Sequence, residues 1–147
     1  RGDPTYADKA ARVSALTRDL SELLPEIAPA LQGRVRPAAG TLAFHPPCTL
    51  QHGQQLRGGV EQHLGDLGFN VRLASNESHL CCGSAGTYSV LQPEIAHQLR
   101  DRKLGHLGEL APAAIVSANI GCITHLQSGT ATPVRHWIEV LDAALTY

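Results

Sequence analysis

The four cysteines of this 147-residue chain are the residues best suited to do chemistry: Cys48, the adjacent pair Cys81 and Cys82, and Cys122. Several thiolates gathered in one place repel one another and are costly to desolvate, whereas a bound metal favours the deprotonated thiol. Soft sulfur ligands select zinc, copper(I) or iron–sulfur clusters. The cysteines therefore predict a metal site, provided that the fold brings them together.

The adjacent pair favours a centre with more than one metal atom. Structural zinc sites usually draw on a C-x₂₋₄-C spacing, which closes a comfortable loop around one ion. Thiolates on consecutive residues reach different metal atoms more easily. Gly83 and Gly86 after the pair permit a close approach of the backbone, and we expect the following helix to point free N–H groups at the site.

The loop around Cys122 has a similar character, because Gly121 precedes the cysteine and His125 lies one helical turn beyond it. His125 is the histidine with ligand spacing to a cysteine, so we expect it as a further ligand. His45, His79 and His136 are also predicted to lie near the site.

Three predicted strands must position these thiols. Residues 41–45, 70–74 and 113–118 are short, largely apolar segments, and each is followed by one of the cysteine loops. Helical patterns over residues 52–67 and from Pro93 onward separate them. This alternation predicts an α/β fold with a short parallel sheet of about four strands flanked by helices. Ligands of such sheets bind beyond the carboxyl ends of the strands, where all four cysteines would meet.

The two ends of the chain complete this picture. A fourth strand is predicted at residues 133–136, followed by a helix that contains Trp137. The N-terminal segment predicts one helix, capped by Asp3 and disrupted by Pro25 and Pro29. We therefore divide the chain into residues 1–35, an N-terminal helix and linker from the upstream part of a longer protein, and residues 36–147, the compact cysteine-rich domain.

Composition excludes several classes of function. Twelve basic residues are spread against thirteen acidic ones and aromatic residues are scarce, so we expect no nucleic-acid partner. No apolar run approaches the ~20 residues of a membrane span, and no export signal is present, which favours a reducing, cytoplasmic compartment. The absence of methionine indicates an excised piece of a longer polypeptide.

Three alternatives to a metal site stay open at this point. The even number of cysteines is compatible with two disulfides, and buried inert thiols would explain one or two of the four. The GSAG loop at residues 83–86 lacks both the G-x-G-x-x-G spacing and a P-loop lysine, so it argues poorly for nucleotide binding.

The chain resembles the family of cysteine-rich CCG domains, whose pattern is a cysteine, CCG and then CxxC at intervals of thirty-odd residues. The blocks that carry the likeness to the iron–sulfur subunits of glycolate-oxidising enzymes are HPPCTLQH, HLCCGSAGTYS, SANIGCITHLQSGT and PVRHWIEVLDAAL. The likeness also covers the N-terminal helical segment. One departure is that Cys122-Ile-Thr-His125 replaces the final CxxC, which exchanges the last thiolate for an imidazole.

The resemblance implies an electron-transfer role. In such a subunit the domain holds an iron–sulfur cluster, typically with four irons and in some copies replaced by zinc, through Cys48, Cys81, Cys82 and Cys122, with His125 as a further ligand. Flavin-containing subunits oxidise glycolate to glyoxylate, and electrons leave through the iron–sulfur subunit toward the respiratory chain. Implied partners are those flavin subunits and an upstream ferredoxin-like part, in a cytoplasmic complex able to associate with the membrane surface. A structural zinc module that docks partner subunits is the alternative. An aerobically prepared fragment is expected to lose the cluster and stay folded.

Overall fold

The computed structural model describes residues 3–146. Its centre is a sheet of four parallel strands in the order β2-β1-β3-β4. The strands are β1 (Thr41–His45), β2 (Asn70–Leu73), β3 (Ala114–Ser117) and β4 (Val134–His136). The register pairs Thr41 with Asn70 and Leu42 with Ala114. Both the predicted fold class and the strand direction are confirmed.

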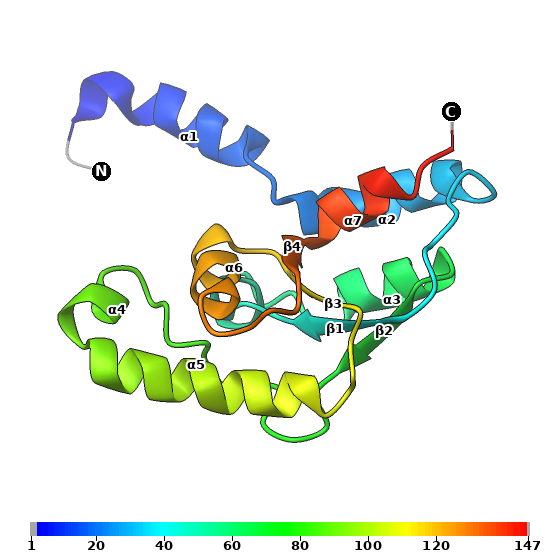
Figure 1. Ribbon diagram of the computed structural model, residues 1–147. Helices are drawn as coiled ribbons and strands as arrows, with labels where there is room; N and C mark the ends of the chain where they lie inside the picture. Colours follow the sequence, from blue (N-terminus) through cyan, green and yellow to red (C-terminus); the bar gives the residue numbers. More distant parts are fainter. Residues whose placement is uncertain (1–2, 147) are drawn as a thin grey trace.

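Helices cover the two faces of this sheet (Figure 1). On one face lie α2 (Leu20–Leu31), α3 (Gly59–Asp66) and α7 (Trp137–Ala143). On the other lie α5 (Pro93–Gly108) and α6 (Ile120–Gln127). Two shorter elements, η2 (Thr49–Gly53) and α4 (Tyr88–Leu91), lie in the connections. The short η1 (Pro4–Tyr6) leads into α1 (Ala7–Leu16), which extends away from the sheet.

The strand pleat divides the core into two apolar clusters. Leu42 and Phe44 of β1 point toward α2, α3 and α7, where they join Leu24 and Trp137. Ala43 points to the opposite face, toward α5 and α6. Because successive side chains of a strand alternate between faces, His45 follows Ala43 to the α5 and α6 side.

The N-terminal segment differs from the single helix predicted for it. The chain is extended at Thr17 and then begins α2 with a capping box, in which Asp19 accepts from the N–H of Ser21 and Glu22 accepts from the N–H of Asp19. Pro25 and Pro29 lie inside α2 and do not end it. Burial of Leu24 and Ala28 against the sheet offsets the cost of a proline within a helix.

Two further boundaries differ from the sequence prediction. The helix expected over residues 52–67 begins only at Gly59, because Gln55 and Gly58 both have positive φ and interrupt a helical path. Residues 49–53 form a separate wide turn instead. The division at residue 36 stays a prediction, although α2 contributes Leu24 and Ala28 to the common core.

None of the helices described between residues 3 and 146 combines the length and apolar character that a bilayer crossing requires.

Candidate metal centre

The four cysteines meet at the carboxyl edge of the sheet. Cys48 follows β1, the pair Cys81–Cys82 lies in the loop after β2, and Cys122 lies in the first turn of α6 after β3. All four are free thiols, and all four line one cavity of about 350 Å³. The adjacency of β1, β2 and β3 in the sheet is what brings these loops together.

The thiols form a graded series from the surface inward. Cys48 and Cys81 are half-buried, whereas Cys82 and Cys122 are 1% and 8% exposed. Hydrogen bonding to the Cys122 thiol raises the pKa of Cys82 to about 11, and hydrogen bonding to Cys82 raises the pKa of Cys81 even further. Burial raises the pKa of Cys48. A cation bound among these thiols would favour their deprotonated form.

Backbone donors point at the adjacent pair. The N–H of Gly83 donates to Cys81 Sγ at 3.3 Å, and the N–H of Ser84 lowers the pKa of Cys82 against the larger opposing effects. These donors lie within the loop. The expected contribution from the following helix is absent in its first turn, because α4 has only four residues and the N–H of Ser89 bonds to the carbonyl of Ser84.

The three glycines predicted to matter occupy different situations. Gly83 has a φ of 90°, and a Cβ there would lie 2.3 Å from the carbonyl oxygen of Ala96 on α5. Gly86 also has positive φ but faces open space, and it lines the thiol cavity. Gly121 lines the same cavity, and its N–H donates to Asn119 Oδ1, the N-cap of α6. Gly83 therefore fixes the cysteine loop against α5.

His45 is the site residue that the ligand-spacing argument missed. Its ring is 1% exposed at the end of β1, and neither ring nitrogen has a hydrogen-bond partner among residues 3–146. A ring nitrogen of His45 and the sulfurs of Cys82 and Cys122 all lie within 4.8 Å of one another. Burial, with a smaller contribution from Lys103, lowers the pKa of His45 to about 3, so the imidazole is neutral and able to bind a metal.

His125 lies elsewhere. Its Nε2 is 3.2 Å from the carbonyl oxygen of Ala96, and its ring stacks on His97 with centroids 5.9 Å apart. It lines a neighbouring surface hollow and is absent from the lining of the thiol cavity. Cys122 and His125 are three residues apart on α6, but the imidazole of His125 points toward α5 and not toward the thiols. His136 caps α7 by accepting the N–H of Ile138.

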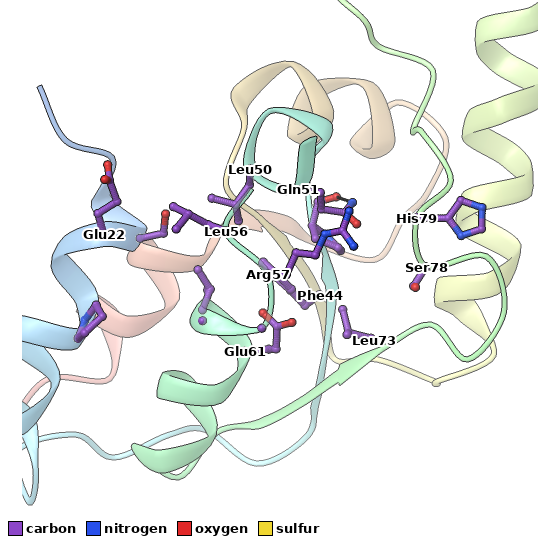
Figure 2. Close-up of a pocket in the computed structure, with 16 residues that line it drawn as sticks. Glu22, Phe44, Leu50, Gln51, Leu56, Arg57, Glu61, Leu73, Ser78 and His79 are labelled. Atoms are coloured by element: carbon purple, nitrogen blue, oxygen red, sulfur yellow. Dashed lines mark hydrogen bonds between the residues drawn. The ribbon is translucent and has the colours of Figure 1, made fainter. Parts of the chain in front are cut away.

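A larger cavity, of about 660 Å³, lies on the other side of the β1 end (Figure 2). Figure 2 shows Glu22 of α2 at one side and His79 at the other, with Leu50 and Leu56 between them. None of the four cysteines lines it. We therefore place the candidate metal centre in the smaller cavity, because that cavity is the one lined by the cysteine thiols.

The residues present fit a metal or cluster well. Four free thiols from three loops face one cavity, and hydrogen bonds among their sulfurs raise the pKa of Cys81 and of Cys82. A buried imidazole with both nitrogens unpartnered points at the same place, whereas buried polar groups ordinarily have partners. These observations argue against two disulfides and against four inert thiols.

Comparison with known proteins gives a family match and several relatives. A family model described as the CCG cysteine-rich domain matches residues 42–127. The chain is 52% identical over 145 residues to the glycolate oxidase iron-sulfur subunit of Escherichia coli strain K12, covering 99% of this chain and 35% of that protein. It is 30% identical to the uncharacterized protein YkgE of the same organism, covering 95% of this chain and 60% of that protein. It is 29% identical to lactate utilization protein A of Geobacillus thermodenitrificans, covering 97% of this chain and 61% of that protein. The chain thus spans less than two thirds of the length of these relatives.

Proposed function

Because the chain belongs to the family of CCG cysteine-rich domains, we propose that it holds an iron–sulfur cluster and serves as an electron-transfer part of an oxidoreductase. The observation that carries this proposal is the convergence of four free thiols, delivered by three separate loops, on one cavity. Relatives named as an iron-sulfur subunit and as lactate utilization proteins support the same class of function.

The proposed ligands are Cys48, Cys81, Cys82 and Cys122. Their positions suit a polynuclear centre, because the sulfurs of the adjacent pair, besides interacting with each other, each contact a further thiol, Cys48 for Cys81 and Cys122 for Cys82. For a fifth donor, the geometry supports His45 over His125. The ring of His45 is unpartnered and close to two of the sulfurs, whereas that of His125 contacts Ala96 and His97.

Each group of the chain has a definite part in this role. A bound cluster supplies the ability to take up and release single electrons. The N–H groups of Gly83 and Ser84 stabilise anionic sulfur, which favours the reduced form. Cys48 and Cys81, half-buried at the mouth of the cavity, provide the edge through which an electron partner approaches.

The proposed setting is a glycolate oxidase-type complex, which rests on the 52% identical relative. Oxidation of glycolate to glyoxylate releases two electrons and two protons, which a flavin subunit would accept together. The domain would then pass the electrons onward singly toward the respiratory chain, with an upstream ferredoxin-like part as its neighbour. A four-iron cluster is the proposed form.

Anaerobic reconstitution of the chain tests the proposal. We expect iron and acid-labile sulfide in equal amounts per chain, a visible charge-transfer absorption and an EPR signal in one oxidation state. Single Cys→Ser changes at positions 81 and 82 should each abolish the signal. Stoichiometric zinc without an iron-dependent signal would refute the proposal.

A structural zinc module is the second candidate, and one observation favours it. His45, Cys82 and Cys122 place three donor atoms close enough together for a single ion, with one more thiol nearby to complete a tetrahedron. Zinc would then organise a surface for docking a partner subunit. In that case the purified chain contains one zinc, and its removal by a chelator unfolds the domain.

A further inference from the structure

Lys103 is a buried lysine that no part of the proposed function has yet used. It lies on the inward face of α5, between Ala96 and Leu107, and is 1% exposed. Lysine is almost never fully buried unless a partner compensates its charge. In an amphipathic helix such as α5, a charged side chain is expected on the solvent face. Lys103 instead lies on the buried face, so its positive charge needs an explanation.

The contacts of Lys103 leave its charge uncompensated. Its Nζ donates to the carbonyl oxygens of Glu77 and Ser78, each at 2.9 Å. Among residues 3–146 it makes no ion pair with a carboxylate, because the carboxylate of Glu77 binds Arg102 and His106 instead. Two neutral carbonyls orient the ammonium but do not cancel its charge.

Three thiols and the carboxylate of Glu77 act on the ammonium. Burial lowers the pKa of Lys103, and the opposing charges that raise it are Cys82 first and then Cys48, Glu77 and Cys81. The same cation contributes to the lowered pKa of His45. The geometry agrees with this, because Leu104 and Leu107, on the same helix as Lys103, pack in the cluster that contains Cys82 and Cys122. The ammonium itself is held by the carbonyls of the segment that leads into the cysteine pair.

The position of Lys103 relative to the cysteine loop is fixed. The close approach of Gly83 to the carbonyl of Ala96 leaves no room between the loop and α5. The segment before the loop is held to the same helix through Glu77, which contacts Arg102 and His106. These contacts, with the two hydrogen bonds of Nζ, hold the ammonium in a defined place relative to the cysteine loop.

We propose that Lys103 is the internal counter-charge of the metal centre, which raises its reduction potential and strengthens its retention of metal. This inference rests on the proposed function, since it needs thiolates bound to a metal. A centre with several thiolate ligands is anionic and becomes more so with each added electron. A fixed cation in a low-dielectric interior stabilises the reduced form more than the oxidised form.

The chain offers a matched control, because its two lysines are Lys103 and Lys9, and Lys9 is exposed on α1. Lys103→Gln removes the charge and keeps an N–H donor for the carbonyls of Glu77 and Ser78. Lys103→Arg keeps the charge, and Lys9→Gln removes an equal charge at the surface. Each variant of the full chain is reconstituted, and its midpoint potential is measured by redox titration followed by EPR.

We expect Lys103→Gln to lower the equilibrium constant for one-electron reduction by about tenfold, which corresponds to about 59 mV. Lys9→Gln and Lys103→Arg should stay close to the unmodified chain. A folded Lys103→Gln protein that takes up no metal, while Lys103→Arg does, supports the proposal as well. An unchanged potential in Lys103→Gln overturns it. Failure of both Lys103 variants to fold also overturns it, because it shows a packing role.

Failure of the proposed function would be recognised separately. If the unmodified chain binds zinc and no iron, electron transfer is refuted whatever Lys103 does. The counter-charge is then tested through zinc affinity, measured by competition with a chelator. Lys103→Gln should bind zinc about tenfold more weakly than Lys9→Gln, and equal affinities would overturn the inference.

Discussion

Gly83 and Gly86 lie in one loop and both have positive φ, yet only Gly83 is sterically confined. Gly83→Ala should destabilise the metal-free protein by at least ~3 kcal/mol, because it combines a left-handed backbone with a clash against Ala96. Gly86→Ala should cost only about 1 kcal/mol, since its Cβ would meet open space. Urea unfolding of both variants measures the difference. Equal losses would show that α5 yields to the added methyl group.

His45 and His125 should respond in opposite ways to replacement by leucine. His45→Leu removes a buried ring without partners, so we expect the metal-free protein to gain about 1 kcal/mol while metal retention falls. His125→Leu removes the contact with Ala96, so it should lose about 1 kcal/mol and retain metal. Denaturant unfolding and metal analysis of each variant provide the two readouts. Loss of metal in His125→Leu alone would restore His125 as the ligand.

At the residue scale, the sequence indicated the cysteines but not the histidine beside them. The thiols follow from residue type and from their place after strands, both of which are visible in the sequence. His45 was noted near the site, but ligand spacing favoured His125. Only the alternation of side chains along β1, together with the pairing of β1 and β3, turns His45 toward Cys82 and Cys122.

Among the elements, α2 depends on its capping box, because two prolines weaken its interior. Asp19→Ala should cost about 1 kcal/mol of unfolding free energy, since it removes the side-chain acceptor for the N–H of Ser21. Asp3→Ala is the matched control. Asp3 caps η1 in the same manner, but η1 and α1 bury no residues, so we expect a change near zero. Thermal unfolding compares the two, and a comparable loss in Asp3→Ala would indicate that α1 contributes to stability.

The segment before the cysteine pair should respond to acid. The hydrogen bond from Arg102 lowers the pKa of Glu77, so the folded state binds the proton more weakly than the unfolded state. The stabilisation from this carboxylate is thus complete above pH 4.5 and is lost as the pH falls through the lowered pKa. Thermal midpoints measured from pH 3 to 7 should therefore fall less steeply in acid for Glu77→Gln. Asp142→Asn, at an exposed carboxyl on α7, should follow the unmodified chain. Parallel curves for all three proteins would contradict the prediction.

Element boundaries were harder to predict than element types. The strands were placed to within a residue or two, because short apolar segments between helical patterns are distinctive. The helix predicted over residues 52–67 began too early, because its leucines keep a helical spacing along the whole segment. In the structure, positive φ at Gln55 and Gly58 interrupts the helical path. The prediction of a single N-terminal helix was wrong because the chain is extended at Thr17 and a second helix begins after the Asp19 cap. Pro25 and Pro29 do not end this second helix, in which Leu24 and Ala28 are buried.

For the whole molecule, removal of metal should leave the fold intact. The cluster of apolar residues on the α2, α3 and α7 face contains no cysteine, and it includes Trp137, Phe44 and Leu24. The cluster on the α5 and α6 face includes Cys82 and Cys122. After anaerobic chelation we expect unchanged far-UV circular dichroism and a retained cooperative transition. Faster amide hydrogen exchange should be confined to α6 and the cysteine loop. Complete unfolding on chelation would instead favour structural zinc.

The fold class and the family were accessible from the sequence, and both are confirmed by the sheet and by the match over residues 42–127. The role of Lys103 as a counter-charge was not accessible from the sequence, because a lysine within a helix is expected to be exposed to solvent until its burial is known. Its partners are carbonyl groups at residues 77 and 78, which carry no side-chain pattern.

The sheet order β2-β1-β3-β4 also sets the timing of assembly. Cys48 and the adjacent pair come together when β2 docks on one side of β1, but Cys122 arrives only when β3 docks on the other side. A nascent chain that ends before α6 can offer three thiols and no more. The last of the four thiols therefore depends on a long-range strand pairing, and the complete set of sulfurs exists only once synthesis has passed α6.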